Sequence, residues 1–493
     1  MSRRAFFPLL ALTLTLTSGD AHAGGPASAQ HGRDSAGVFW FMHISDLHIG
    51  ASAIEGPHAT EHLDVALGEA VSVIQPKFVA ATGDLCDGSL YGIPATGQSQ
   101  EEWDTYKAAL TKSGMTPTFY FDFPGNHDGY GDKGLTFYLA NSLLGQTSGA
   151  LWASWQVNTP AGKYRFFGLD SAGDGSGAFI EDPHFPEDQV AMLSAELGTA
   201  PDAELTFVLA HHRLEQPDNG AAVIDILTNA GGAFYLHGHV HDYTEYTEGN
   251  GAIVVNEVAS LGKNDEANIG VGAVDNNGFV YRATDVTAPW PFVMITSPTS
   301  VVLRGGAEPN PYAYFVCKDR VDNPFRALVF APAPPSEVTI TVEGLSPFPM
   351  KPVPGSTALW EAEIDTTSLA ATVLDVTVSA TAGGVTRAET ITAGFSAGPC
   401  DPLPGGEGGA GGAGGAGGAI TGGSGGAIAG GAGGAIAGGA GGAIAGGAGG
   451  AIEDLDATGG CGCRTTGDDP APRGAPWLAL GALALMVRRA RRR

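Results

Sequence analysis

The stretch Leu236-His237-Gly238-His239-Val240-His241 (LHGHVH) closes an apolar run and places three histidines in six positions. In an extended strand successive side chains alternate between the two faces, so all three histidines would point the same way. Spacing alone therefore does not decide which of them takes part in chemistry. The polar residues that could act with them must be found elsewhere in the chain.

Polar motifs also follow other apolar runs. From Val38 to about Asp285, strand-like runs alternate with segments of helical spacing such as EHLDVALGEAVSVI, which predicts an α/β sheet covered by helices. The motifs after the runs are Asp46-Leu47-His48, Gly83-Asp84, Gly125-Asn126-His127-Asp128, His211-His212 and Gly238-His239-Val240-His241. Sites in open α/β sheets form beyond the carboxyl ends of strands, so we expect these five strand ends to meet at one edge.

The side chains of these motifs are carboxylates, an amide oxygen and imidazoles. Such mixed oxygen and nitrogen ligands suit divalent or trivalent first-row metals better than calcium or magnesium. A carboxylate can bridge two metals, and a metal pair activates water and holds the attacking and leaving oxygens of a phosphoryl group. Each motif alone has a simple structural interpretation, for instance a left-handed turn at Asn126, but the set together favours chemistry.

In this order the motifs resemble those of the calcineurin-like metallophosphoesterases. The resemblance implies a four-layer αββα sandwich over residues 38–288 and two metal ions, with Fe, Mn and Zn all compatible. By position it implies one metal bound by Asp46, His48 and His241, a second bound by Asn126, His211 and His239, and Asp84 as the bridge. It also implies that His127 orients the phosphate and protonates the leaving group.

Other residues near the motifs receive lesser roles. His211 directly ends its strand and is the expected ligand, whereas His212 faces the substrate phosphate or merely packs. Asp87 and Asp128 are expected to support the ligands or to shape turns. His237 is left as a structural residue.

A second resemblance reaches beyond the first domain. FWFMHISDLHI, EWDTY at Glu102–Tyr106 and PWPFVMITSP at the domain junction resemble the transmembrane metallophosphoesterases that carry an Ig-like domain after the catalytic one. Over residues 291–400, short β-rich runs separated by Pro and Gly predict an Ig-like or fibronectin-like all-β sandwich. Several membrane helices follow in those proteins, but a glycine-rich segment follows here.

The two ends of the chain carry targeting signals. Residues 1–23 have a basic start, a short apolar stretch and Ala21-His22-Ala23, which predicts a cleaved secretory signal peptide. Residues 401–458, with IAGGAGGA repeating from Ile428, predict a disordered Gly/Ala-rich tether. Residues 459–493 combine a Cys motif, a short hydrophobic helix and an Arg cluster, and they resemble Myxo-CTERM sorting tails.

The tail implies export, processing by a protease and anchoring at the cell surface or outer membrane, with Cys461 or Cys463 as possible sites of lipidation. A plain, weak transmembrane anchor is the alternative. Since export permits disulfides, we expect Cys317 and Cys400, near the two ends of the second domain, to pair. Cys86 would then be a buried free thiol.

The net charge of the chain limits the classes of partner that we expect it to bind. A formal net charge of −27 argues against non-specific nucleic-acid binding and disfavours a nuclease. The leading hypothesis is a secreted, surface-tethered phosphoesterase in which a metal-bound hydroxide attacks a phosphomonoester or phosphodiester. The alternative is a non-catalytic surface binding or adhesion protein built on the same scaffold.

Overall fold

The computed structural model describes residues 35–52, 55–88, 97–173, 183–198, 203–263, 267–304, 306, 308–398 and 400. The segments predicted to be a signal peptide, a Gly/Ala-rich tether and a sorting tail, including Cys461 and Cys463, lie outside these residues. Within them no helix is long and apolar enough to cross a membrane.

Two sheets form the first part of the chain. The first sheet has the order β11 (Gly278–Asp285), β10 (Asn268–Asp275), β1 (Val38–Ile44), β2 (Val79–Thr82) and β3 (Tyr120–Phe123). The second has the order β4 (Ala153–Thr159), β5 (Gly162–Gly168), β6 (Leu205–Leu209), β7 (Ala233–His237), β9 (Ile253–Glu257) and β8 (Thr244–Glu248). Strands β1, β2 and β3 run parallel, as do β5, β6, β7 and β9, so their carboxyl ends share an edge within each sheet.

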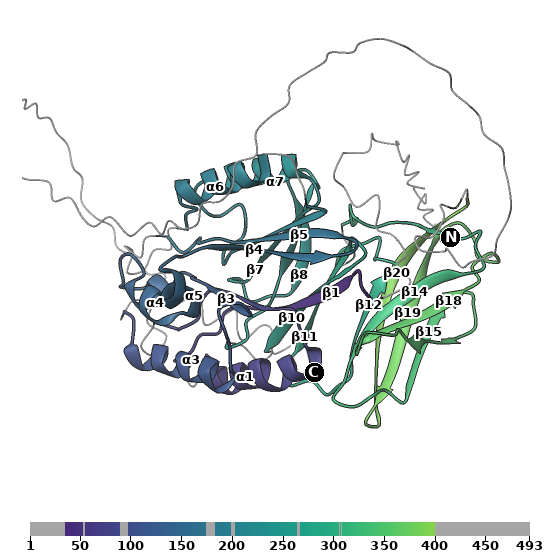
Figure 1. Cartoon of the computed structure of the whole chain (residues 1–493), viewed down its shortest axis with the longest axis horizontal. Coiled ribbons are helices and arrows are strands. Elements are labelled where there is room, and N and C mark those ends of the chain that lie inside the picture. Colours follow the sequence, from purple (N-terminus) through teal and green to yellow (C-terminus); the bar gives the residue numbers. More distant parts are fainter. Residues whose placement is uncertain are drawn as a thin grey trace, which may run out of the picture. The chain divides into compact units, whose positions relative to one another are not determined.

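The helices follow the apolar spacing of their sequences. They are α1 (Ala59–Val65), the π-helical turn η1 (Ala66–Ala70), α2 (Val71–Ile74), α3 (Gln100–Lys112), the 3-10 turn η2 (His127–Gly129), α4 (Thr136–Asn141), α5 (Leu143–Ser148), α6 (Glu187–Gly198) and α7 (Gly220–Ala230). In Figure 1, α1 and α3 lie on one side of the strands, and α6 and α7 on the other.

Three buried clusters fill the space between these layers. One packs Leu63 and Trp103 of the helices against Met42 of the first sheet. A second joins the sheets to each other through aromatic rings such as Phe41 and Phe207, whose centroids lie 5.9 Å apart. The third packs Leu193 and other residues of α6 and α7 against the second sheet. The prediction of a mixed α/β fold with helix-covered sheets is confirmed.

From Pro291 to Cys400, the residues that the structure describes form strands and loops only. One sheet has the order β12 (Phe292–Ser297), β14 (Asn323–Phe330), β18 (Leu359–Ile364) and β17 (Lys351–Pro352). The other has the order β13 (Val316–Cys317), β20 (Val385–Ser396), β19 (Val373–Ala382), β15 (Glu337–Val342) and β16 (Phe348–Pro349). A single core that includes Phe325, Ile340 and Val378 lies between them, so we call this part the two-sheet unit.

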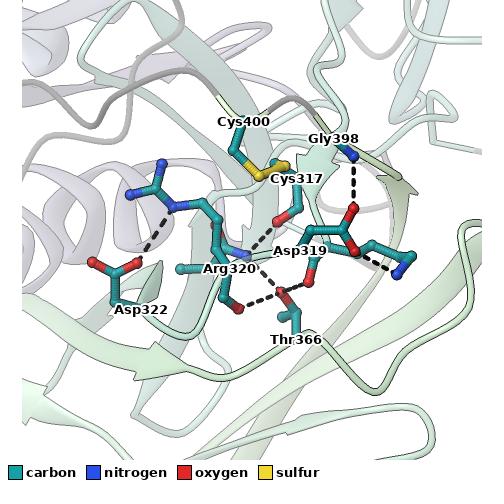
Figure 2. The surroundings of a disulfide bond; sticks show 9 residues. Cys317, Asp319, Arg320, Asp322, Thr366, Gly398 and Cys400 are labelled. Carbon is teal, nitrogen blue, oxygen red and sulfur yellow. Dashed lines mark hydrogen bonds and ion pairs between the residues drawn. A yellow bond between two sulfur atoms is a disulfide. The ribbon is translucent and has the colours of Figure 1, made fainter.

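The expected disulfide between Cys317 and Cys400 is present, and Cys86 is a buried free thiol. The disulfide closes a corner of the two-sheet unit. Thr366 accepts a hydrogen bond there from Asn323 (2.6 Å) and donates one to the Lys318 carbonyl (2.9 Å), and Figure 2 shows Gly398 donating to Asp319 (2.8 Å).

In the apolar run at Tyr312–Cys317, one of the β-rich runs of this part of the chain, only Val316 and Cys317 pair with β20. Tyr312 instead leaves the unit. Its hydroxyl accepts a hydrogen bond from Ala233 N of β7 at 3.0 Å and donates to the carbonyl of Ala252, which directly precedes β9. The preceding part of the run therefore fastens the two parts of the chain together rather than extending a strand.

Candidate metal centre

The predicted site residues come together where strands of both sheets end. Asp46 and His48 follow β1, Asp84 follows β2, and Asn126 and His127 follow β3. From the second sheet, His211 and His212 follow β6, and His239 and His241 follow β7. Five strand ends therefore contribute to one polar cluster, as the sequence predicted.

The backbone turns sharply at these positions. Five of the predicted ligands have positive φ angles: Asp46 (54°), His48 (46°), Asp84 (50°), His239 (70°) and His241 (61°). Non-glycine residues seldom adopt this conformation, and such strain concentrates at functional sites. The backbone bends where each strand ends. The ligand side chains of one motif can therefore reach the same cluster by a path that an extended strand does not provide.

The first group of ligand atoms comprises Asp46 Oδ1, His48 Nε2 and His241 Nε2. Asp46 Oδ1 lies 3.0 Å from His241 Nε2 and 3.8 Å from His48 Nε2, and the two nitrogens lie 3.2 Å apart. His241 lies at ion-pair distance from this buried oxygen, which has no assigned hydrogen-bond partner. Three ligand atoms thus face one another in the way that a bound cation requires.

The second group lies on the other side of Asp84. His211 Nε2 is 3.0 Å from Asn126 Oδ1 and 3.3 Å from His239 Nδ1. Asp84 Oδ2 lies 3.2 Å from His211 Nε2 and 3.8 Å from His48 Nε2, which places this oxygen between the two groups. A bridging carboxylate would occupy such a position.

Backbone amides orient both carboxylates. His239 N donates to Asp46 Oδ2 at 2.9 Å, and His127 N donates to Asp84 Oδ1 at 2.9 Å. Each carboxylate is thereby left with one oxygen turned toward the imidazoles. Gly238 makes this approach possible, because a Cβ atom there would lie 2.2 Å from Asp46 Oδ2.

The charges of the cluster favour a cation. Burial acts to raise the pKa of Asp84, but the nearby charges of His211 and His127 hold it well below its usual range. Burial acts to lower the pKa of His211, yet the carboxylates of Asp84 and Asp46 raise it to about 10. With buried carboxylates, an amide oxygen and imidazoles together, the residues fit divalent or trivalent first-row metal ions.

A shell of hydrogen bonds supports the predicted ligands. Asp87 Oδ1 lies 3.0 Å from His48 Nδ1 and 2.6 Å from Lys263 Nζ, and His211 Nδ1 bonds the Thr82 carbonyl at 2.8 Å. Carboxylates and carbonyls in such places fix the orientation of metal-binding imidazoles. The sequence pointed to Asp87 as a supporting residue but not to Lys263, which stands in a loop without a motif.

His127 stands at the open side of the cluster. Its Nδ1 bonds the Asp87 carbonyl at 2.5 Å, and its Nε2 lies 3.9 Å from Asp84 Oδ2. Its side chain is 17% exposed, whereas those of His48 and His211 are fully buried. Asn126 Nδ2 donates to the hydroxyl of Tyr130 at 2.9 Å, a residue that the sequence did not single out.

His237 and His43 point to partners outside the cluster. His237, the last residue of β7, bonds the Gly238 carbonyl at 2.9 Å and the Tyr246 hydroxyl at 3.2 Å. His43 bonds the Tyr281 hydroxyl at 2.7 Å and Thr82 Oγ1 at 2.8 Å. Both are buried, and these bonds account for both of their ring nitrogens.

Comparison with known proteins finds a family match in the first part of the chain. Residues 39–243 match the family model of the calcineurin-like phosphoesterases. Mouse transmembrane protein 62 is 27% identical over 332 residues, which cover 64% of this chain and 48% of that protein. An Arabidopsis thaliana protein, named as a candidate metallophosphoesterase, is 27% identical over 187 residues, which cover 35% of this chain and 24% of that protein.

The chain thus spans about half the length of the first relative and a quarter of the second. Among solved structures, a Streptococcus pneumoniae protein described as a predicted phosphoesterase is 11% identical, covering 50% of this chain and 90% of its own. Vacuolar protein sorting 29 of Cryptosporidium parvum is 10% identical, covering 72% of this chain and 98% of its own. Both TM-scores are 0.22, too low to support a fold assignment.

Proposed function

Because residues 39–243 form a calcineurin-like phosphoesterase domain, we propose that this chain hydrolyses a phosphomonoester or phosphodiester at a pair of metal ions. The family implies a phosphoric ester hydrolase, although some of its members are non-catalytic. The observation that carries the proposal is the position of Asp84 Oδ2, 3.2 Å from His211 and 3.8 Å from His48, between two groups of ligand atoms.

The proposed ligands divide as the family resemblance implies. Asp46, His48 and His241 would hold one ion, Asn126, His211 and His239 the other, and Asp84 both. Two such ions supply positive charge that activates a water and stabilises the charge on the phosphoryl group. The buried carboxylates and the oriented imidazoles keep this charge fixed in place.

His127 is the proposed general acid. The Asp87 carbonyl holds its Nδ1 and thereby fixes the ring, while Nε2 faces the cluster at its exposed side. Since the carbonyl can only accept, Nδ1 carries a hydrogen, and His127 acts as an acid in its doubly protonated form, in which Nε2 also carries a proton that can pass to the leaving oxygen of a substrate.

His212 is the proposed substrate-binding residue. Ser171 Oγ accepts hydrogen bonds from the backbone N–H groups of His211 and His212, both at 3.2 Å, so its own hydroxyl donates to His212 Nδ1 at 3.0 Å. The ring then carries its proton on Nε2, a buried atom without a hydrogen-bond partner. A protonated Nε2 does not bind a metal, but it can donate to a phosphate oxygen.

Hydrolysis of p-nitrophenyl phosphate and bis-p-nitrophenyl phosphate with added Mn²⁺ tests the function. We expect turnover that His127→Ala lowers by at least a hundredfold. A metal-loaded protein without turnover on either compound, or on a wider panel of phosphate esters, would contradict it and favour the non-catalytic binding protein.

Metal analysis tests the ligands separately. We expect His239→Ala and His241→Ala each to lose one ion per chain, whereas His237→Ala keeps both. Equal loss from all three variants, in protein that remains folded by circular dichroism, would show that the assignment of LHGHVH is wrong.

Export and surface anchoring belong to the same proposal. The signal-like segment at residues 1–23 and the disulfide between Cys317 and Cys400 support an oxidising compartment. We propose that residues 291–400 are an Ig-like spacer, that the Gly/Ala-rich segment is a tether, and that a protease processes the sorting tail. Cell fractionation with antibody against the two-sheet unit would test the location.

A further inference from the structure

A cavity lies away from the metal centre, between the end of β11, the segment leading into β12, and β20. Its volume is about 310 Å³, and none of the proposed ligands lines it. A second hollow of about 210 Å³ shares Arg282, Arg304 and Thr390 with it, so the two adjoin. We call the combined space the junction groove.

The junction groove collects arginines in an acidic chain. Residues 35–400 contain seven arginines, and three of them, Arg282, Arg304 and Arg387, line the larger cavity. The formal net charge of the whole chain is −27. Positively charged side chains are therefore concentrated at the junction groove although the protein as a whole is acidic.

The carboxylates of the cavity wall are already engaged. Glu389 accepts hydrogen bonds from Arg282 Nε and from the Ile295 amide. Asp285 Oδ1 accepts from the Thr287 amide at 2.7 Å and from its hydroxyl at 2.6 Å. Arg282 pairs with Glu389 and also lies 3.6 Å from Glu245, so its charge is largely neutralised.

Arg304 and Arg387 have no carboxylate partner among the ion pairs of the described residues. The Arg304 guanidinium lies over the Tyr243 ring, 3.8 Å from its centre, and Arg387 Nε donates to the Pro289 carbonyl at 3.3 Å. Stacking and a single hydrogen bond hold the side chains in place while other N–H groups stay available. Arginine in this state binds oxyanions through charge-assisted hydrogen bonds.

The walls of the groove are fixed relative to each other. Arg326 of β14 is fully buried and lies 3.1 Å from Asp275 Oδ1 of β10. Thr296 of β12 donates to the other oxygen of Asp275 at 2.7 Å. These contacts join the strands on both sides of the groove, so a ligand would meet a preformed site rather than order it.

We propose that the junction groove binds a small organic anion of monosaccharide size, with Arg304 and Arg387 holding its oxyanion group. Trp290 lines the same cavity and offers apolar surface to the carbon skeleton of the ligand. A sulfate ester and a sugar carboxylate share the required chemistry. Neither is a phosphate ester, so binding at the groove is separable from hydrolysis at the metal centre.

Isothermal titration calorimetry of the metal-loaded full chain with glucose 6-sulfate and with glucuronate tests the proposal. We expect saturable binding of at least one probe, weakened tenfold or more by Arg304→Gln and by Arg387→Gln. The matched control is Arg165→Gln. Arg165 stands in β5 and lies 3.6 Å from Glu196 of α6, so its replacement should leave binding at the groove unchanged.

If only one probe binds, its anionic group, sulfate ester or carboxylate, is the class of ligand that the groove accepts. Absence of saturable binding by both probes would overturn the proposal, as would equal affinity in the wild type and the Arg304→Gln/Arg387→Gln double variant. Hydrolysis of bis-p-nitrophenyl phosphate by the same preparations reports the phosphoesterase function independently, and the two arginine variants should not change it.

Discussion

The sheet edge where the predicted metal ligands meet and the disulfide corner of the two-sheet unit both bury polar groups, but the atoms left without hydrogen-bond partners differ between them. At the corner, Thr366 both accepts from Asn323 and donates to the Lys318 carbonyl. At the edge, Asp46 Oδ1 and His212 Nε2 are buried without a hydrogen-bond partner. At the corner Asn323 Oδ1 also lacks a partner, but it is an amide oxygen within a bonded network, whereas the atoms at the edge belong to a carboxylate and an imidazole that face a candidate ligand site.

Replacement of Asp84 by Asn should have the largest effect. The variant removes the charge between the two ligand groups, so we expect loss of at least one ion and a fall in turnover on the order of a thousandfold. Metal content and hydrolysis of bis-p-nitrophenyl phosphate measure both effects. Full activity with two bound ions would remove the basis for treating this edge as a binuclear site.

Replacement of Cys317 by Ser should affect stability instead of turnover. The disulfide joins residues separated by 83 positions, and closing a loop of this length contributes about 4 kcal/mol to the free energy of unfolding. Urea unfolding of the variant should show this loss, while turnover per folded molecule stays within twofold. A large drop in turnover would mean that the corner and the edge are coupled.

Replacement of Asp87 by Asn tests the support of the edge. The amide keeps the size of the side chain but loses the charge that lies 3.0 Å from His48 Nδ1, so we expect turnover to fall about 10- to 100-fold. Asp365→Asn is the control, because that carboxylate caps a turn in the two-sheet unit. Similar turnover in both variants would assign Asp87 to the turn alone.

The pH dependence of stability should also differ between the two regions. Burial, followed by the nearby charge of His237, lowers the pKa of His43 from 6.5 to about 3. Between these values the unfolded chain binds the proton and the folded protein does not, so the contribution is present above pH 6.5 and lost on acidification. From pH 7 to pH 5 we expect His43 alone to cost about 2 kcal/mol.

Urea unfolding of the wild type and His43→Gln at both pH values measures this contribution, since the variant should lose less stability on acidification. No histidine follows His241 in the sequence, so hydrogen exchange in β19 should respond less to acid than exchange in β1. If acidification increased hydrogen exchange more in β19 than in β1, the expected difference between the two regions would be wrong.

Much of the fold was predictable because the buried strands are nearly continuous apolar runs, as β6 and β7 show. The hairpin of β10 and β11 was not predicted, because glycines interrupt its first strand. At Gly272 a Cβ atom would lie 2.4 Å from the Phe41 ring, so the aromatic core and not the strand pattern dictates this residue. Such long-range packing is not visible in local spacing.

The motif order also predicted which site residues would meet. It did not predict the left-handed backbone at His239 and His241, since strand alternation describes only extended residues. Lys263 is near Asp87 only through the fold, so a spacing pattern could not reveal it. Whether the predicted residues bind metals stays a prediction that the metal analysis above would test.

The buried ion pair of Arg326 and Asp275 limits where the chain can be truncated. Ending the chain at Pro289, before the two-sheet unit, would leave Asp275 without its guanidinium partner. It would also remove Met294, Leu328 and Phe330 from the core that they share with α1 and α3. Removal of one member of a buried ion pair typically costs about 3–5 kcal/mol. The smallest soluble fragment that contains the candidate metal centre should therefore extend through Cys400.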